Sequence, residues 1–382
     1  MKIIAWYLPQ FHVTPENNKW WGEGFTEWTN VKKAKQYAPD QYQPRVPLNG
    51  NYYDLTDVKT QEWQVSLAKE YGVYGFCMHH YWFDGKLLLE KPVEQYLANP
   101  QLDLPFCLCW ANEHWTNAWA DGTPEILIEQ HYGGPEEWKQ HFAYLLPFFR
   151  DPRYIKHGNK PFFIIYRAEL IECLAEMMVC WQELSRAAGF DGIDFACKTR
   201  STALMQPADI PLFTYQVDYQ PGDEFEVYRM QHYGPLIRIQ RFLSAKLSGL
   251  IHFDIGQISP FKLQHYDYDE IWNMILKRQP TGPGNIPGAF TDWDNTPRKD
   301  LRGKYTVGVS PEKFGDYLAR QIRHARDDYH ADMIFLFAWN EWAEGGYLEP
   351  DEKNGYGFLQ AIRRALQETG EWEGPAPREA LL

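Results

Sequence analysis

The chain has 382 residues, with 38 Lys and Arg against 51 Asp and Glu, which gives a formal net charge of −13 at pH 7. This acidity excludes nucleic-acid and anionic-membrane binders that rely on overall charge. Hydrophobic residues make up 44% and charged residues 23%, a balance that excludes a disordered chain. The aromatic share of 16% is high, and it provides more rings than one core needs.

The longest uninterrupted apolar run covers residues 333–339, far short of the ~18 residues that a membrane span needs. The apolar N-terminal stretch is broken by Pro9 and Gln10 before it reaches the length of a secretory signal core. Six cysteines occur without the paired spacing of a zinc site. The sequence therefore predicts a cytoplasmic protein with reduced cysteines, no membrane span, no metal and no cofactor.

Short apolar or aromatic runs alternate along the chain with segments of helical periodicity. The runs that predict strands cover residues 2–8, 74–82, 106–111, 161–167, 193–199, 212–219, 288–293 and 333–339. The segments that predict helices cover residues 57–71, 135–149, 171–188, 267–277, 311–328 and 357–368. Several begin with a helix-start signal, such as Pro135 followed by two glutamates, or Ser310 before Pro311.

This alternation predicts an α/β protein, and about eight such units close into a (β/α)8 TIM barrel. We expect one catalytic domain over residues 1–382, because no repeat and no low-complexity linker divides the chain. Long segments follow the strand ends at residues 9–56, 112–134, 220–266 and 343–356. They predict long βα loops on the active-site face. A doubly wound sheet is the alternative, but no Gly-rich phosphate loop follows the first strand.

Two glutamates follow the last predicted strand. Glu341 and Glu344 lie among Trp339, Trp342 and Tyr347. Glycosidic bond cleavage needs one carboxyl group to protonate the leaving oxygen and a second to act as base or nucleophile. Aromatic rings stack on sugars and exclude water, which raises the pKa of a nearby carboxyl group. Glu341 and Glu344 are therefore the predicted catalytic pair, although both could also be ordinary loop residues.

Other predicted strand ends carry hydrogen-bonding groups beside aromatic rings, the combination that binds a hydroxyl-rich sugar. We expect carbohydrate to be the substrate. The predicted substrate-binding residues are Tyr7, Trp28, His80, Trp82, Trp110, Asn112, Glu113, Asp292, Trp339, Asn340 and Tyr347.

Two short patterns admit other interpretations. His79 and His80 point to opposite faces of a continuing strand, so they do not ligate one metal, and one of them is expected to be structural. Asp292 and Asp294 match the Asp-x-Asp pattern that holds a metal and a nucleotide diphosphate in many sugar transferases. Three-residue patterns arise often by chance, so this match is weak.

Longer motifs carry a family resemblance over nearly the whole chain, from Ile3 to Phe358. The chain contains Trp6-Tyr7-Leu8-Pro9-Gln10-Phe11-His12 and Gly24-Phe25-Thr26-Glu27-Trp28-Thr29-Asn30. It also contains His80-Tyr81-Trp82-Phe83, Trp110-Ala111-Asn112-Glu113 and Trp339-Asn340-Glu341-Trp342-Ala343-Glu344-Gly345. These blocks resemble the WbsX-like family of polysaccharide-associated proteins, which is similar in turn to glycoside hydrolase family 99, the endo-α-mannosidases and endo-α-mannanases.

The resemblance to family 99 implies a (β/α)8 barrel, no obligatory metal and retention of the anomeric configuration. It implies that Glu341 acts as base on the 2-hydroxyl of the sugar, which attacks the anomeric carbon to give a 1,2-anhydro sugar. Glu344 then protonates the leaving group. After Gly345 this chain has Gly346 and Tyr347 where family 99 has Thr and Gln. Mannose specificity therefore does not transfer with the catalytic pair.

The predicted function is a glycoside hydrolase acting on a bacterial polysaccharide or oligosaccharide. One alternative is a glycosyltransferase in O-antigen or capsule assembly, an activity attached to the WbsX-like name. The other is a non-catalytic glycan-binding barrel, which would need the aromatic rings but not the paired glutamates.

Overall fold

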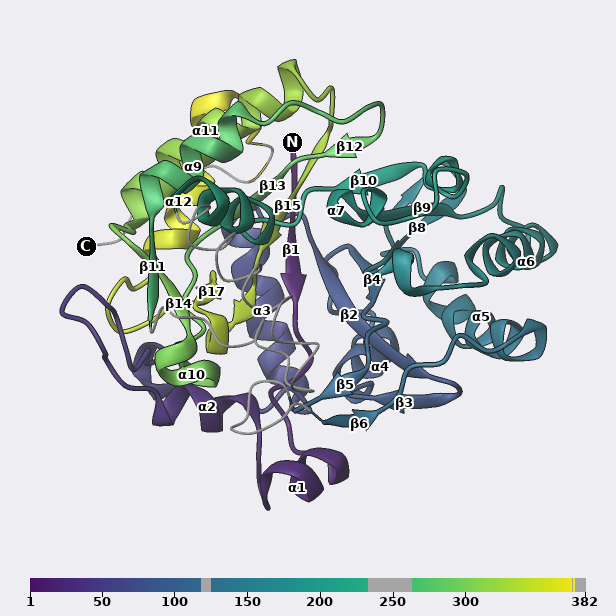
Figure 1. Ribbon diagram of the computed structural model, residues 1–382, viewed down its shortest axis with the longest axis horizontal. Coiled ribbons are helices and arrows are strands. Elements are labelled where there is room, and N and C mark those ends of the chain that lie inside the picture. The colour runs from purple at the N-terminus through teal and green to yellow at the C-terminus, as the bar shows by residue number, and fades with distance from the viewer. Residues whose placement is uncertain (118–124, 233–262, 373, 375–382) are drawn as a thin grey trace, which may run out of the picture.

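A barrel of parallel strands forms the centre of the computed structural model, which describes residues 1–117, 125–232, 263–372 and 374 (Figure 1). Its strands all pair in parallel. Their order around the sheet is β12 (Asn285–Ile286), β10 (Tyr215–Val217), β9 (Asp194–Lys198), β8 (Lys160–Ile165), β4 (Phe106–Trp110), β2 (Gly75–Phe83), β1 (Lys2–Tyr7), β15 (Met333–Phe337) and β13 (Gly288–Phe290).

The barrel closes between β12 and β13, which follow one another along the chain with only Pro287 between them. β12 pairs with β10, and β13 pairs with β15, so this one position contacts both neighbouring strands. The nine strands thus occupy eight positions. The predicted (β/α)8 barrel is confirmed, and each of the eight predicted runs overlaps one position of the ring.

The helices surround this barrel (Figure 1). The longer ones are α3 (Val58–Tyr71), α4 (Lys91–Ala98), α5 (Pro135–Arg150), α6 (Leu174–Ala187), α9 (Tyr268–Lys277), α11 (Pro311–Asp327) and α12 (Gly357–Thr369). The predicted start signal at Ser310 is a true cap, because its side chain accepts a hydrogen bond from the backbone of Lys313. The sequence periodicity did not predict helix α4, nor the helix that covers residues 222–232 in the segment expected to be a loop.

Short elements occupy the loops. The short helices are α1 (Pro15–Trp21), α2 (Glu27–Lys33), α7 (Thr199–Thr202), α10 (Thr296–Lys299), η1 (Leu48–Gly50), η2 (Ala168–Leu170), η3 (Ile210–Leu212), η5 (Asp300–Arg302) and η6 (Trp342–Glu344). Strands β3 (Lys86–Leu88) and β7 (Lys156–His157) add antiparallel to β2 and β8. The remaining pairs are β5 (Trp115–Thr116) with β6 (Ile126–Ile128), β11 (Gln264–Asp267) with β14 (Lys304–Val307), and β16 (Asn340–Glu341) with β17 (Gly346–Tyr347).

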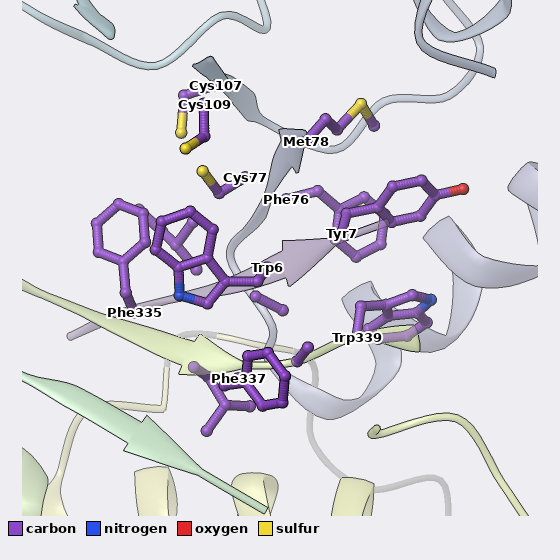
Figure 2. Packing of buried hydrophobic residues seen from close by; sticks show 14 of the residues in the cluster. Trp6, Tyr7, Phe76, Cys77, Met78, Cys107, Cys109, Phe335, Phe337 and Trp339 are labelled. Carbon is purple, nitrogen blue, oxygen red and sulfur yellow. The ribbon is translucent and has the colours of Figure 1, made fainter. Parts of the chain in front are cut away.

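Aromatic rings fill both sides of the barrel wall, and neighbouring residues of β1 point to opposite sides. Trp6 packs inside the barrel, with its ring centroid 5.3 Å from that of Phe335. Tyr7 packs outside against Phe76, at 5.1 Å. Figure 2 shows Trp6 and Phe335 on one side of these strands, and Tyr7, Phe76 and Trp339 on the other. This alternation decides which side chains can reach the barrel mouth.

All six cysteines carry free thiols in the structure, and four of them, Cys77, Cys107, Cys109 and Cys197, are buried. None of the helices in the described parts of the chain combines the length and the apolar character that crossing a membrane requires. The cytoplasmic location stays a prediction.

We expect Gly288→Ala to weaken the closure of the barrel. A Cβ atom at Gly288 would overlap the carbonyl oxygen of Asp218, a backbone atom that can move only with the end of β10. Overpacking of this kind costs about 1–3 kcal/mol of unfolding free energy, which urea denaturation would measure. Gly282→Ala is the control, because a Cβ atom there meets no atom within 4 Å. Equal stability of the two variants would contradict this account of the seam.

Candidate active site

A cleft with two lobes opens at the carboxyl ends of the barrel strands. The inner lobe has a volume of about 250 Å³, and the outer lobe about 300 Å³. Five residues line both lobes: Gln10, His114, Trp115, Arg298 and Glu344. The inner lobe is completed by Leu8, His79, Tyr81, Ala111, Glu113, Tyr166, Tyr219, Phe337 and Glu341. The outer lobe is completed by Asn17, Trp21, Phe25, Glu27, Leu89, Thr116 and Lys299.

The two predicted catalytic glutamates lie together in this cleft. Glu341 ends the short strand β16, and Glu344 ends the turn η6 that follows it. The side chain of Asn340 fixes their position, because it accepts a hydrogen bond from the backbone of Leu8 at 2.8 Å and donates one back at 3.0 Å. Glu341 is buried, whereas the side chain of Glu344 is 22% exposed. Glu341 lines only the inner lobe, and Glu344 lines both.

Arg298 joins these glutamates through one guanidinium group. Its Nη2 lies 3.1 Å from Oε1 of Glu341, and its Nη1 lies 3.0 Å from Oε1 of Glu344. A third carboxylate, that of Glu27, contacts Nη2 at 3.1 Å. The three contacts join α10 to α2 and to the adjacent elements β16 and η6, three regions that are far apart in the sequence.

The proton affinity of Glu341 reflects this crowding. Burial, together with the charges of Glu344 and Glu27, raises the pKa of Glu341 to about 8, although Arg298 opposes the rise. The same carboxylates raise the pKa of Arg298 well above its usual value, so the guanidinium stays charged. The site therefore holds a carboxyl group that exchanges its proton near neutral pH, beside a permanent cation.

The buried carboxylate of Glu349 lies behind the two glutamates and binds the aromatic side chains next to them. Glu349 accepts hydrogen bonds from Trp342 at 2.6 Å, Gln64 at 2.7 Å, Tyr53 at 2.8 Å and Trp339 at 3.1 Å. Burial raises the pKa of Glu349 to about 7 in spite of these four donors. Because Trp339 and Trp342 flank the sequence that carries Glu341, Glu349 fixes the backbone on which the pair is mounted.

The opposite wall of the inner lobe comes from β4, β8 and β10. Glu113 forms an ion pair with Arg167. The buried side chain of Asn112 brackets Arg167, accepting a hydrogen bond from its N–H at 2.8 Å and donating one to its carbonyl oxygen at 2.9 Å. The rings of Tyr166 and Tyr219 meet edge to face, with their centroids 5.4 Å apart.

The predicted substrate-binding residues differ in whether they line the cleft. Of the eleven, only Glu113 lines the described cleft. Asn340 and Trp339 support the predicted catalytic pair, and the ring of Tyr347 stacks on that of Trp342, with centroids 3.8 Å apart. The other side chains lie behind the cleft wall, and Asn112 holds Arg167 from there.

Five of these residues are engaged outside the barrel or behind the pair. Tyr7 donates to Gln64 at 2.8 Å, and Trp28 donates to the carbonyl oxygen of Tyr53 at 2.7 Å. His80, Trp82 and Trp110 pack around the buried His141 of α5. For these side chains the geometry gives no support to direct contact with a sugar.

Asp292 and Asp294 follow β13, and their side chains bind other protein groups. Asp292 forms a buried ion pair with Arg45, at 2.8 Å. Asp294 accepts hydrogen bonds from Thr296 at 2.7 Å and from Gln41 at 2.9 Å. Both carboxylates are thus engaged by protein donors. Among the residues that the structure describes, no group of three or more His, Cys, Asp or Glu side chains is arranged to hold a metal ion.

The sequence interpretation missed most of the cleft wall. It chose His80 and Trp82 on β2, but the alternation of that strand sends His79 and Tyr81 into the inner lobe instead. The face of β1 occupied by Trp6 would have indicated the correct alternation. No local signal marks Arg298, because its role depends on a short helix docking beside a turn 43 residues further along the chain.

Comparison with known proteins places the chain in a family. The sequence profile described as Glycosyltransferase WbsX matches residues 3–362, so the chain belongs to this family. The uncharacterized protein WxcX of Xanthomonas campestris pv. campestris, from strains B100 and ATCC 33913, is 34% identical over 366 residues. This match covers 95% of the chain and 49% of each relative, so the chain spans about half the length of these relatives.

Solved structures share the fold. The glycoside hydrolase family 99 endo-α-mannosidase of Bacteroides thetaiotaomicron superposes with a TM-score of 0.55 at 13% identity, covering 97% of each chain. A protein described as glycoside hydrolase-like superposes with a TM-score of 0.52 at 10% identity, covering 95% of this chain and 93% of its own. At these identities the likeness concerns the fold.

We expect Glu341→Gln to stabilise the protein at alkaline pH. Because its pKa is raised, folded Glu341 keeps a proton that the unfolded chain releases above about pH 4.3, so the free energy of unfolding falls as the pH rises from about 4.3 to 8. The variant lacks this loss, and at pH 8 it should exceed the wild type by on the order of a few kcal/mol.

Urea denaturation at pH 4 and pH 8 would measure this difference, which should nearly vanish at the lower pH. Glu368→Gln, an exposed position on α12, is the control and should follow the wild type. A Glu341→Gln variant that is less stable than the wild type at pH 8 would contradict the buried, proton-holding state of this side chain.

Proposed function

We propose that this member of the WbsX family is a retaining glycoside hydrolase that cleaves a bacterial polysaccharide or oligosaccharide. The observation that carries the proposal is the convergence of Glu341 and Glu344 on one guanidinium at the floor of a cleft large enough for sugars. The shared fold of the family 99 endo-α-mannosidase supports it. No metal or cofactor enters the proposed reaction.

In the proposed first step, ionised Glu341 accepts the proton of the 2-hydroxyl group of the sugar in the inner lobe. The freed oxygen attacks the anomeric carbon while the glycosidic bond breaks, and the leaving oxygen takes the proton of Glu344. The products of this step are a 1,2-anhydro sugar, a released glycan end, protonated Glu341 and ionised Glu344. The intermediate is thus formed within the substrate and not on the enzyme.

In the second step, ionised Glu344 accepts a proton from water as the water oxygen attacks the anomeric carbon. The three-membered ring opens, and its 2-oxygen recovers the proton that Glu341 holds. The net change is the addition of water across the glycosidic bond, and two displacements at one carbon retain its configuration. Throughout this cycle one proton moves between two carboxyl groups that share Arg298 as counter-ion.

The two lobes of the cleft can hold the two parts of the substrate, the reacting sugar and the leaving glycan. An acid that protonates the leaving oxygen must reach the boundary between the reacting sugar and the leaving group. Glu344 lines both lobes, whereas Glu341 lines only the inner one. We therefore assign the reacting sugar to the inner lobe and the leaving glycan to the outer lobe, where Trp21, Phe25 and Trp115 offer stacking surfaces.

The family description favours a second candidate, a glycosyltransferase. Such an enzyme would bind a nucleotide sugar at the same cleft. Titration calorimetry with sugar nucleotides and Mn²⁺ separates the two candidates, because the hydrolase proposal predicts no binding of the nucleotide portion. Tight binding of a sugar nucleotide together with sugar transfer would favour the transferase.

We expect Glu341→Gln and Glu344→Gln each to lower kcat by about 10²-fold to 10⁴-fold, since each variant loses one proton transfer. Reducing-end release from a panel of defined bacterial polysaccharides, with products identified by mass spectrometry, would supply the assay. Glu136→Gln, exposed in the first turn of α5, is the control and should keep full activity. Near-normal turnover in either catalytic variant would remove the mechanism.

We expect kcat/KM to fall as the pH rises through about 8. The proposed mechanism needs one proton on the pair of Glu341 and Glu344, and the raised pKa of Glu341 places the loss of that proton near pH 8. Arg298→Gln should move this falling limb to higher pH, because the loss of the cation disfavours the carboxylate. Arg150→Gln, exposed at the end of α5, is the control. A kcat/KM that keeps rising through pH 8 would contradict the requirement for this proton.

A further inference from the structure

Lys198 lies at the carboxyl end of β9, beside the inner lobe. Its Nζ lies 3.4 Å from the ring centroid of Tyr166 and 5.3 Å from that of Tyr219, and both rings line the lobe. With the residues that the structure describes, this ammonium makes no ion pair and no hydrogen bond. The proposed mechanism does not use it.

The carboxylates around Lys198 already have arginine partners. Glu113 and Glu169 both contact Arg167, the latter at 2.5 Å. Asp223 lies 3.5 Å from Arg278. Burial lowers the pKa of Lys198 to about 8, although the charge of Glu113 opposes the shift. Lys198 is half-buried, and within the described parts of the chain its ammonium contacts ring faces and no protein acceptor, so its three N–H groups can take an acceptor from a ligand.

Resting on the hydrolase proposal, we propose that Lys198 binds a carboxylate on the sugar in the inner lobe, so that the substrate is an acidic polysaccharide containing a uronic acid. The ammonium supplies three donors and a full charge, and the carboxylate supplies the missing acceptors. Tyr166 and Tyr219, whose rings the ammonium approaches, both line the inner lobe.

The geometry of a pyranose ring agrees with this assignment. The carboxylate of a uronic acid is attached to C5, which lies across the six-membered ring from C2. The proposed mechanism holds the 2-hydroxyl at Glu341, and β9 lies three strand positions from β15 around the barrel. One sugar can therefore present its 2-hydroxyl to Glu341 and its carboxylate to the wall beside Lys198, away from Glu341 and Glu344.

A singly charged carboxylate suits this wall better than a phosphate. Lys198 would supply a single positive charge to the ligand. The side chain of Glu113, a negative charge on the same wall, is 44% exposed. A phosphate carries up to two negative charges, so it would meet stronger repulsion from Glu113. Phosphate recognition also favours the planar fork of arginine, and Arg167 is already committed to two carboxylates.

The test measures binding without turnover. Ligand-observed NMR titrations would compare glucuronate, galacturonate and mannuronate with glucose, galactose and mannose, using the full chain as wild type, Lys198→Met and Lys198→Arg. We expect at least one uronate to bind the wild type about 10-fold more tightly than its neutral counterpart, the effect of one charge-assisted hydrogen bond. Lys198→Met should abolish this preference and Lys198→Arg should keep it. Lys277→Met, exposed at the end of α9, should bind as the wild type does.

The proposal is overturned if no uronate binds better than its neutral counterpart, or if folded Lys198→Met keeps the preference. Tighter binding of glucose 6-phosphate or mannose 6-phosphate than of every uronate would overturn the assignment to a carboxylate. Since these monosaccharides are not cleaved, the result is independent of hydrolysis. If uronates bind through Lys198 and no polysaccharide is cleaved, the hydrolase proposal fails while this one stands.

Discussion

The contact of one guanidinium with three carboxylates offsets the desolvation cost of placing these carboxylates together. Removing a carboxylate from water costs several kcal/mol unless an opposite charge replaces the lost solvation. Arg298 supplies that charge to Glu341, Glu344 and Glu27 together. One cation cannot balance three anions, so the site keeps a proton near neutral pH, and the raised pKa of Glu341 expresses this imbalance. A proton held this loosely is what an acid and base pair needs.

The surrounding fold makes such a site tolerable. The barrel wall is packed with rings on both sides, and its large buried apolar surface offsets the unfavourable charges at the mouth. Glu349 and Asn340 then hold the backbone after β15 in place, through hydrogen bonds to two indoles and to the backbone of Leu8, directly after β1. These supporting contacts lie behind the cleft, and they position the two glutamates of the proposed catalytic pair.

The sequence allowed the barrel and the convergence of Glu341 and Glu344 to be predicted, because both depend on local patterns. Apolar runs that alternate with helical periodicity determine the fold class, and Glu341 and Glu344 are near neighbours that follow one strand. Choosing indoles and histidines by type placed His80 and Trp82 in the cleft, whereas the alternation along β2 buries both against α5. Arg298, Tyr166, Tyr219 and Lys198 come from separate elements, and only the closed barrel brings them together.

The family description names a glycosyltransferase, whereas the proposed function is hydrolysis, and the site itself is where the two can be separated. A carboxyl NMR titration of protein carrying ¹³C-labelled glutamate, with Glu341→Gln used to assign the signal, tests the central claim most directly. The account predicts that Glu341 titrates well above the ordinary range of a glutamate, and higher still in Arg298→Gln. A carboxyl group that titrates near its ordinary value of about 4.3 in both proteins would contradict it.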